Sequence, residues 1–327
     1  MRPWLFLLAL AGLCLAAALV AIYGAGEVAA AFVGAGWGLA AVVLARAVQI
    51  ASAGLAWRVV TPPAPPVVPG RFIFLRFIRE SINALLPVAQ IGGDLIGARL
   101  LTFYGPSGGL AGASVIVDIF IQVTSQFLYT LLGFGILAAL GGDSPLIASI
   151  GYGLLVAIPI LFAFFLVQRA GGLRLIERLL MRLGARGQWP NLGPAPDLDT
   201  NIHRIYARPA ALVLGFAIHL ATWLFGTSEV WMVLAFMGHP VSMLQALAIE
   251  SLGQAVKGAA FAVPGAYGIQ EGGFVALCAV FGVPAQVALA LSLAKRVPDV
   301  VIGLPGLVAW QGLEGHRLWQ LRRRDMR

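Results

Sequence analysis

Residues 76–94 read RFIRESINALLPVAQIGGD, and this stretch decides how the rest of the chain is interpreted. A short apolar helix with one charged stripe comes first, and Pro87 follows it. Gly92 and Gly93 then open a second short segment. Proline removes a backbone donor and crowds the preceding turn, so the first helix should end near Pro87. We therefore expect a broken hairpin over about 72–104.

The second half of the chain repeats this pattern more weakly. Glu250-Ser251 opens a similar segment, Pro264-Gly265 interrupts it, and Gln270-Glu271-Gly272-Gly273 opens the return arm. The arms are mostly shorter than the roughly 20 residues that a full membrane span requires. Interrupted apolar segments at matching places in two halves are typical of the binding site of a transporter. We expect a second re-entrant hairpin over about 243–282, and two full spans are the alternative.

Composition places the chain in a membrane. It has 327 residues, of which 60% are hydrophobic and only 11% charged, whereas soluble domains carry about 25% charged residues. We expect an all-α integral membrane protein, a polytopic helical bundle with the two hairpins arranged as an inverted repeat. The expected full spans are 3–23, 37–57, 113–140, 146–168, 209–237 and 286–311.

The distribution of arginine predicts the topology. Arginines gather in the loops 58–79 and 169–208 and in the tail after 316, whereas the loops 24–36, 141–145 and 238–242 have almost none. Cytoplasmic loops are rich in Lys and Arg, so both termini should be cytoplasmic. The net charge of +8 then reflects topology and not binding to nucleic acid. We expect one transmembrane domain over 1–327. It divides into a first half (1–168), a cytoplasmic amphipathic loop (169–208) and a second half (209–327).

Polar residues recur at helical spacing inside the apolar segments. Ionisable groups at membrane depth cost free energy, so they usually face a bundle interior or a wet cavity. For any one residue the alternative is a structural pair that locks two helices together. The candidate substrate-binding or gating residues are Arg46, Glu80, Asn83, Asp94, Arg99, Asp118, Glu229, Glu250, Lys257, Gln270, Glu271, Lys295, Arg296 and Asp299. The candidate hinge residues are Pro87, Gly92, Gly93, Pro264, Gly265, Gly272 and Gly273.

Catalytic motifs are absent from the sequence. There is no His-Glu-x-x-His, no Gly-x-Ser-x-Gly and no phosphate-cradling loop. The two cysteines, Cys14 and Cys278, both lie in apolar runs, so we expect neither a disulfide nor a thiol metal site. We expect no cofactor, no metal and no enzymatic activity.

The two hairpin motifs resemble a known family. They are similar to the membrane, flippase-like region of lysylphosphatidylglycerol synthases and its stand-alone relatives, and most similar to the hopanoid-biosynthesis-associated branch. The residues that carry the resemblance are Arg79-Glu80-Ser81, Asn83, Leu86-Pro87, Gly92-Gly93-Asp94, Arg99, Glu250-Ser251, Pro264-Gly265, Gly268, Gln270-Glu271-Gly272-Gly273, Phe281-Gly282 and Lys295-Arg296. The synthases also have a soluble aminoacyl-transfer domain. This sequence ends at Arg327 without one, so we do not expect it to make lysyl-lipid.

The resemblance implies a multi-pass protein of the bacterial inner membrane that moves or handles polar lipids. We expect a lipid translocator or lipid-transport component for hopanoids or another polar lipid. Its partners would be membrane lipids with anionic headgroups, with hopanoid-biosynthesis proteins as candidates. The alternative is a membrane enzyme, or an enzyme's partner or scaffold, in the modification of hopanoid or isoprenoid lipids, where intramembrane carboxylates would serve as acid and base.

Overall fold

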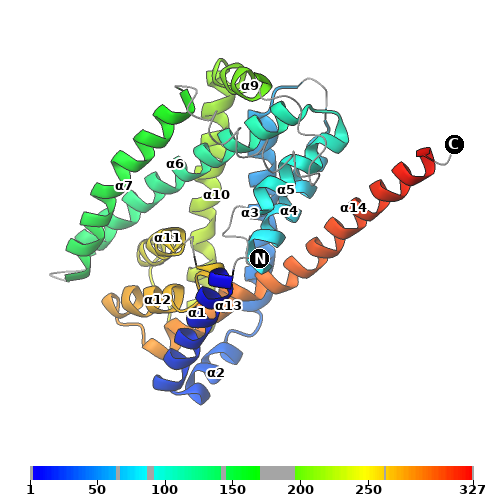
Figure 1. Cartoon of the computed structure of the whole chain (residues 1–327). Coiled ribbons are helices and arrows are strands. Elements are labelled where there is room, and N and C mark those ends of the chain that lie inside the picture. The colour runs from blue at the N-terminus through cyan, green and yellow to red at the C-terminus, as the bar shows by residue number, and fades with distance from the viewer. Residues whose placement is uncertain are drawn as a thin grey trace.

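The computed structural model describes residues 3–63, 67–86, 92–140, 145–169, 196–260 and 263–325. The regular elements in these ranges are helices, and no strand occurs among them, which confirms the all-α prediction (Figure 1). The first half contains α1 (Pro3–Ile22), α2 (Ala25–Gly34), α3 (Gly38–Val60), α4 (Pro69–Leu85), α5 (Gly92–Leu101), α6 (Gly108–Leu140) and α7 (Pro145–Arg169). The second half contains α9 (Pro196–Tyr206), α10 (Pro209–Phe236), α11 (Met243–Ala259), α12 (Ile269–Val280), α13 (Ala285–Val301) and α14 (Gly303–Asp325).

Three helices in the described ranges, α3, α6 and α10, are long and apolar enough to cross a membrane. Leu13–Ile22 of α1 and helix α2 pass the same test together, although they meet at an angle of 95°. Helices α3, α6 and α10 agree with three of the predicted spans, and α1 covers the segment where the span 3–23 was expected. A shorter apolar helix, Ala148–Ile160, lies within α7, where another span was expected.

Two predicted boundaries are wrong. The segment 24–36 was expected to be a loop, but most of it forms α2, and Gly24 turns the chain with a φ of 88°. The single span expected over 286–311 consists of two helices, because α13 ends at Val301 and α14 begins at Gly303. Pro305 explains the second break, since it has no N–H to donate to the carbonyl of Val301.

The expected cytoplasmic loop, 169–208, also contains α9, and its residues 170–195 lie outside the described part.

The first predicted hairpin consists of α4 and α5, two helices that are too short to span a membrane and that pack on each other. Asn83 near the end of α4 accepts a hydrogen bond from the backbone N–H of Gly93 at 2.8 Å. A Cβ at position 93 would collide with the carbonyl oxygen of Arg79. Gly93 is therefore required by the close approach of the two arms. Pro87 lies outside the described residues.

The second predicted hairpin consists of α11 and α12, which also pack together. A turn that includes Pro264–Ala266 joins them, with positive φ at Gly265 (66°) and Gly268 (76°). Such backbone conformations favour glycine. A Cβ at Gly273 would press on the side chain of Val256 in the opposite arm, whereas Gly272 faces open space.

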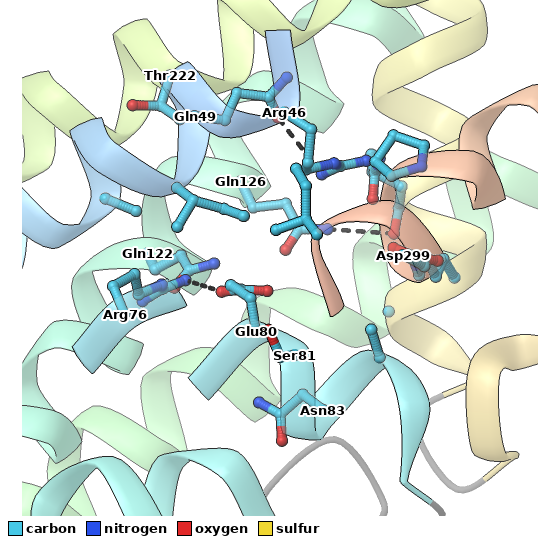
Figure 2. Close-up of a pocket in the computed structure, with 18 of the residues that line it drawn as sticks. Arg46, Gln49, Arg76, Glu80, Ser81, Asn83, Gln122, Gln126, Thr222 and Asp299 are labelled. Carbon is cyan, nitrogen blue, oxygen red and sulfur yellow. Dashed lines mark hydrogen bonds and ion pairs between the residues drawn. The ribbon is translucent and has the colours of Figure 1, made fainter. Parts of the chain in front are cut away.

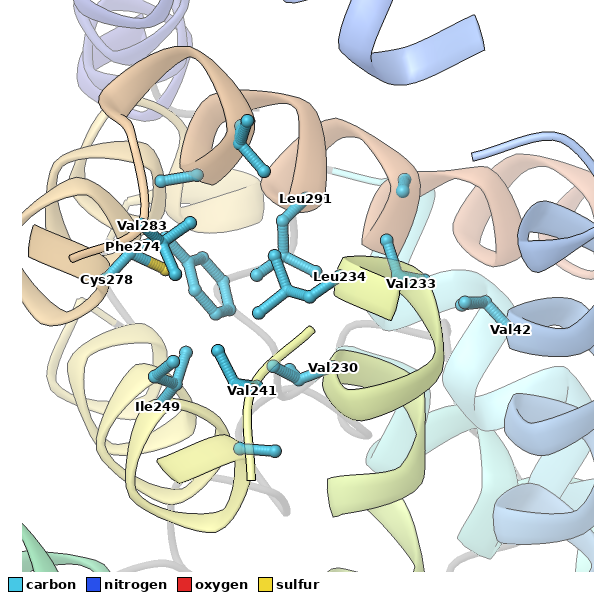
Figure 3. Close-up of a cluster of buried hydrophobic side chains, with 14 residues drawn as sticks. Val42, Val230, Val233, Leu234, Val241, Ile249, Phe274, Cys278, Val283 and Leu291 are labelled. Carbon is cyan, nitrogen blue, oxygen red and sulfur yellow. The ribbon is translucent and has the colours of Figure 1, made fainter. Parts of the chain in front are cut away.

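Each hairpin has its own apolar core. Figure 3 shows the core around the second hairpin, where Phe274 of α12 meets Leu234 of α10 and Leu291 of α13. A separate cluster joins the first hairpin to α3 and α6 around Trp57 and Phe72. Helices α3 and α10 pack along each other and connect the two halves. Each half thus has a long helix, a helical hairpin and a further helix in the same order; the inverted orientation of the two halves stays a prediction.

Candidate functional site: a polar cavity between the hairpins

A cavity of about 360 Å³ lies inside the helical bundle. Its walls come from α3, α4, α5, α6, α10, α11 and α13, and the break at Ile302 and Gly303 also lies on them (Figure 2). The residues predicted from sequence that line it are Arg46, Glu80, Asn83, Asp94, Lys257, Gly265 and Asp299. The cavity therefore unites part of the predicted set.

Several polar residues of the wall were not among the predicted site residues. They are Gln49, Arg76, Gln122, Gln126, His219, Thr222, Trp223 and Gln254. Many of them fall on the same helical stripes as the predicted residues. Gln122 follows Asp118 by four positions, and Gln254 follows Glu250 by four. This periodicity was a signal available in the sequence.

Asp118 is the centre of one ionic cluster on the cavity wall. Its side chain is fully buried on α6, and its Oδ2 accepts from the Nη1 atoms of Arg76 at 3.2 Å and Arg79 at 3.1 Å. Its Oδ1 lies 3.1 Å from Nε2 of His219 on α10. A buried carboxylate requires partners of this kind, because an unpaired charge at membrane depth is costly.

The same cluster holds the two arms of the first hairpin together. Arg79 of α4 donates to Oδ1 of Asp94 on α5 at 2.5 and 3.0 Å, and its guanidinium lies 4.7 Å from the ring centre of Trp57. Arg76 pairs with Glu80 one turn along α4, at 2.6 Å. We call these residues the Asp118 cluster: Arg76, Arg79, Glu80, Asp94, Asp118 and His219.

Glu229 of α10 is the centre of a second cluster. Lys295 of α13 lies 2.6 Å from Oε2 of Glu229 and 2.9 Å from Oε1 of Glu250 on α11. Gln49 of α3 donates to Glu229 at 2.5 Å, and Arg46 pairs with it at 3.5 Å. We call the four charged residues of this group the Glu229 cluster: Arg46, Glu229, Glu250 and Lys295. Among them, Arg46 lines the cavity.

Three predicted site residues connect α12 to α13 outside the cavity. Arg296 pairs with Glu271 at 2.8 Å, and Glu271 also accepts from the backbone N–H of Gly268 at 2.7 Å at the start of α12. Gln270 donates to Ser292, whose hydroxyl reaches Glu271. A carboxylate in the first turn of a helix satisfies free N–H groups and complements the helix dipole. The geometry thus gives Glu271 a capping role.

Arg99 also lies away from the cavity. It binds Glu314 of α14 through Nε at 2.9 Å and Nη2 at 3.1 Å. The start of α14 packs closely on α4, since a Cβ at Gly303 would lie 2.7 Å from the side chain of Leu85. Arg99 therefore attaches the first hairpin to the C-terminal helix.

Lys257 and Asp299 differ from the other charged residues of the wall. Both line the cavity, and within the described ranges neither forms a hydrogen bond or an ion pair. The charged atoms of both side chains also keep some exposed surface, because neither belongs to the buried polar atoms without a partner in the described residues. One cation and one carboxylate are therefore open to whatever enters the cavity. The described residues contain no group of three or more His, Cys, Asp or Glu that could hold a metal ion.

The fold and the cavity together define the class of this protein: a polytopic helical membrane protein with a polar cavity inside its bundle. The family model described as the lysylphosphatidylglycerol synthase TM region matches residues 5–306. The chain therefore belongs to this family, as the hairpin motifs predicted, and the family implies a role in lipid handling. No curated protein and no solved structure matches the chain.

Proposed function

We propose that this protein is a lipid translocator of the bacterial inner membrane. A lipid headgroup would pass through the cavity while the hydrocarbon tails stay in the surrounding bilayer. The observation that carries the proposal is the cavity itself, whose wall carries charged and amide side chains and which lies where elements of both hairpins meet the long helices. Moving a polar headgroup across the apolar interior is the costly part of lipid translocation, and a polar path lowers that cost.

The outer faces of the long helices support this proposal. Large apolar side chains are exposed on α3, α6 and α10, for example Leu44, Leu132 and Val213. Such surfaces are suited to contact with hydrocarbon tails. The volume of about 360 Å³ falls within the range of small-molecule sites and suits a headgroup.

The open charges suggest how a headgroup would be held. Lys257 has a free ammonium for a phosphate or another anion, and Arg46 lies on the same wall. Asp299 would accept hydrogen bonds from hydroxyl or amine groups of the headgroup. A hopanoid with a polar tail and an anionic glycerolipid are the two cargo classes to compare. The hopanoid-related sequence motifs support the first, and Lys257 supports the second.

The arginine-rich segments support an orientation with both termini in the cytoplasm. Arg58, Arg71 and Arg208 lie at the same end of the long helices as α9, and Arg208 donates to the carbonyl of Val60 at 3.2 Å. Positive residues concentrate on the cytoplasmic side of membrane proteins. The cavity would then receive headgroups made on the cytoplasmic face.

The test is a leaflet-resolved assay with the purified full chain in vesicles. A lipid labelled on its headgroup is exposed to an impermeant quencher, and the protected fraction is followed with time. We expect redistribution by the wild-type protein and its loss in Lys257→Gln and Asp299→Asn. Glu27→Gln, which removes a charge from α2 outside the cavity, should behave as wild type.

The same samples separate transport from catalysis. Mass spectrometry of the recovered lipids should find every mass unchanged while the label changes leaflet. A lipid of altered mass would contradict the proposal and favour an enzyme. Redistribution at the rate of protein-free vesicles would also contradict it.

A further inference from the structure

One buried histidine has an arrangement that a purely structural role does not require. His219 lies on α10 with 2% of its surface exposed, and its Nε2 faces Oδ1 of Asp118 at 3.1 Å. Ionised carboxylates only accept hydrogen bonds, so Nε2 must carry the proton of this bond. The second ring nitrogen, Nδ1, is then the basic atom of the side chain.

Nδ1 is open to the cavity. It forms no hydrogen bond with the described residues, and His219 lines the cavity wall. Nδ1 also keeps some exposed surface, because it does not belong to the buried polar atoms without a partner in the described residues. A proton can therefore reach Nδ1 from cavity water while the bond from Nε2 to Asp118 is kept.

The charged groups of the cavity wall and of the ion pairs next to it can be counted. The Asp118 cluster contains two cations, Arg76 and Arg79, and three carboxylates, Glu80, Asp94 and Asp118, so it carries one excess negative charge when His219 is neutral. The Glu229 cluster balances Arg46 and Lys295 against Glu229 and Glu250. Arg296 is balanced by Glu271, and Lys257 has a counterpart in Asp299.

Taken together, the described residues that form these groups have one carboxylate more than they have cations when His219 is neutral. Uncompensated charge is costly in a low-dielectric interior, and a proton on Nδ1 would neutralise it. The charged groups that bond to Asp118 or share the cavity wall with His219 come from several elements: Arg46 of α3; Arg76, Arg79 and Glu80 of α4; Asp94 of α5; Asp118 of α6; Lys257 of α11; and Asp299 of α13.

We infer that His219 is a proton-binding site that couples headgroup movement to the proton gradient across the membrane. The inference rests on the proposed translocation. An anionic headgroup in the cavity would add a second negative charge to the wall, so the proton and the headgroup should bind together. The step is a simple protonation: water in the cavity delivers a proton to the Nδ1 lone pair, and no bond of the lipid breaks.

The contacts of Asp118 connect this proton to the first hairpin. An imidazolium attracts Asp118 more strongly than a neutral ring does, and it competes with Arg79 for the same carboxylate. Arg79 bonds in turn to Asp94 on the return arm of the hairpin. A change of charge at His219 therefore alters the interaction that joins the two arms.

The first measurement follows translocation of an anionic labelled lipid by the full chain in vesicles from about pH 5.5 to about pH 8, the range in which histidine typically changes its charge. Wild-type rates should fall as the pH rises, and an acidic exterior should drive accumulation of the lipid in the opposite leaflet. His219→Gln should remove both effects, because an amide can still donate to Asp118 but binds no proton. His203→Gln, on the exposed side of α9, is the matched control and should keep them.

The second measurement does not depend on lipid movement. The chain has four histidines, so nitrogen-15 NMR of histidine-labelled protein should yield a resolvable signal for His219, assigned by its loss in His219→Gln. We expect this signal to change from the neutral to the doubly protonated form on acidification. A ring that stays neutral to pH 5 would overturn the inference even if lipid moves. If no lipid moves, the proposed function itself is wrong. If the ring of His219 takes up a proton but the rate of lipid movement does not depend on the pH gradient, the proposed coupling is wrong.

Discussion

Lys295 and Glu229 form an ion pair of 2.6 Å between α13 and α10, and both side chains are almost fully buried. Lys295 also holds Glu250 at 2.9 Å, so one ammonium satisfies two carboxylates. The two bonds together join α13 to the long helix α10 and to α11 of the second hairpin, behind the cavity wall. Their position indicates that the second cluster keeps the helices together, whereas the proposed function assigns contact with the headgroup to the open charges on the cavity wall.

Removing this ammonium should destabilise the protein. Lys295→Met leaves Glu229 and Glu250 buried with one cation fewer, and breaking a buried pair typically costs about 3–5 kcal/mol. We expect a clear fall in melting temperature in detergent. Lys257→Met is the matched control, since Lys257 forms no ion pair among the described residues, and its melting temperature should stay near that of the wild type. Equal melting temperatures for both variants would contradict this role of Lys295.

Two of the predicted hinge glycines, Gly93 and Gly272, should respond differently to alanine. Gly93→Ala places a methyl group against the carbonyl oxygen of Arg79, and overpacking of this kind costs about 1–3 kcal/mol. Gly272→Ala faces open space within α12, where alanine is the better helix former by up to about 1 kcal/mol. Thermal melting should separate them, with Gly93→Ala less stable than wild type and Gly272→Ala at least as stable. The reverse order would contradict the close packing of the first hairpin.

Asp94→Asn and Glu271→Gln should also have different effects. Asp94 lines the cavity and pairs with Arg79, so its amide variant should lose lipid redistribution. Glu271 caps α12 and pairs with Arg296 away from the cavity. Its amide variant should lower the melting temperature and keep redistribution by the protein that remains folded. Transport and melting curves from the same preparations check both, and normal transport by Asp94→Asn would refute a role for its charge.

Cysteine labelling tests the orientation. In a background with Cys14→Ser and Cys278→Ser, an impermeant thiol reagent is added to intact cells. Pro63→Cys lies in an exposed position after α3 and should react only after the membrane is opened, whereas Pro240→Cys, exposed between α10 and α11, should react at once. The reverse result would invert the topology and place the termini outside.

The sequence by itself determined the class and the local plan of this protein. The low proportion of charged residues and the apolar runs predicted a helical membrane protein, because every backbone group must be satisfied without water in a bilayer. Pro and Gly marked both hairpins, since their effects on the backbone are local. The exception is the break after Val301, which depends on Pro305 within an otherwise apolar run.

Only the tertiary structure decided which charged residues pair with one another and which face the cavity. Helical spacing gives the face on which a side chain lies but not the helix that this face meets. Arg99 and Glu314 are 215 positions apart, and their pairing removes Arg99 from the cavity. His219 was not among the predicted site residues, and its arrangement depends on Asp118, 101 positions earlier. Partner choice depends on distances between packed helices, because Coulomb and hydrogen-bond energies depend on separation in space and not on separation along the chain.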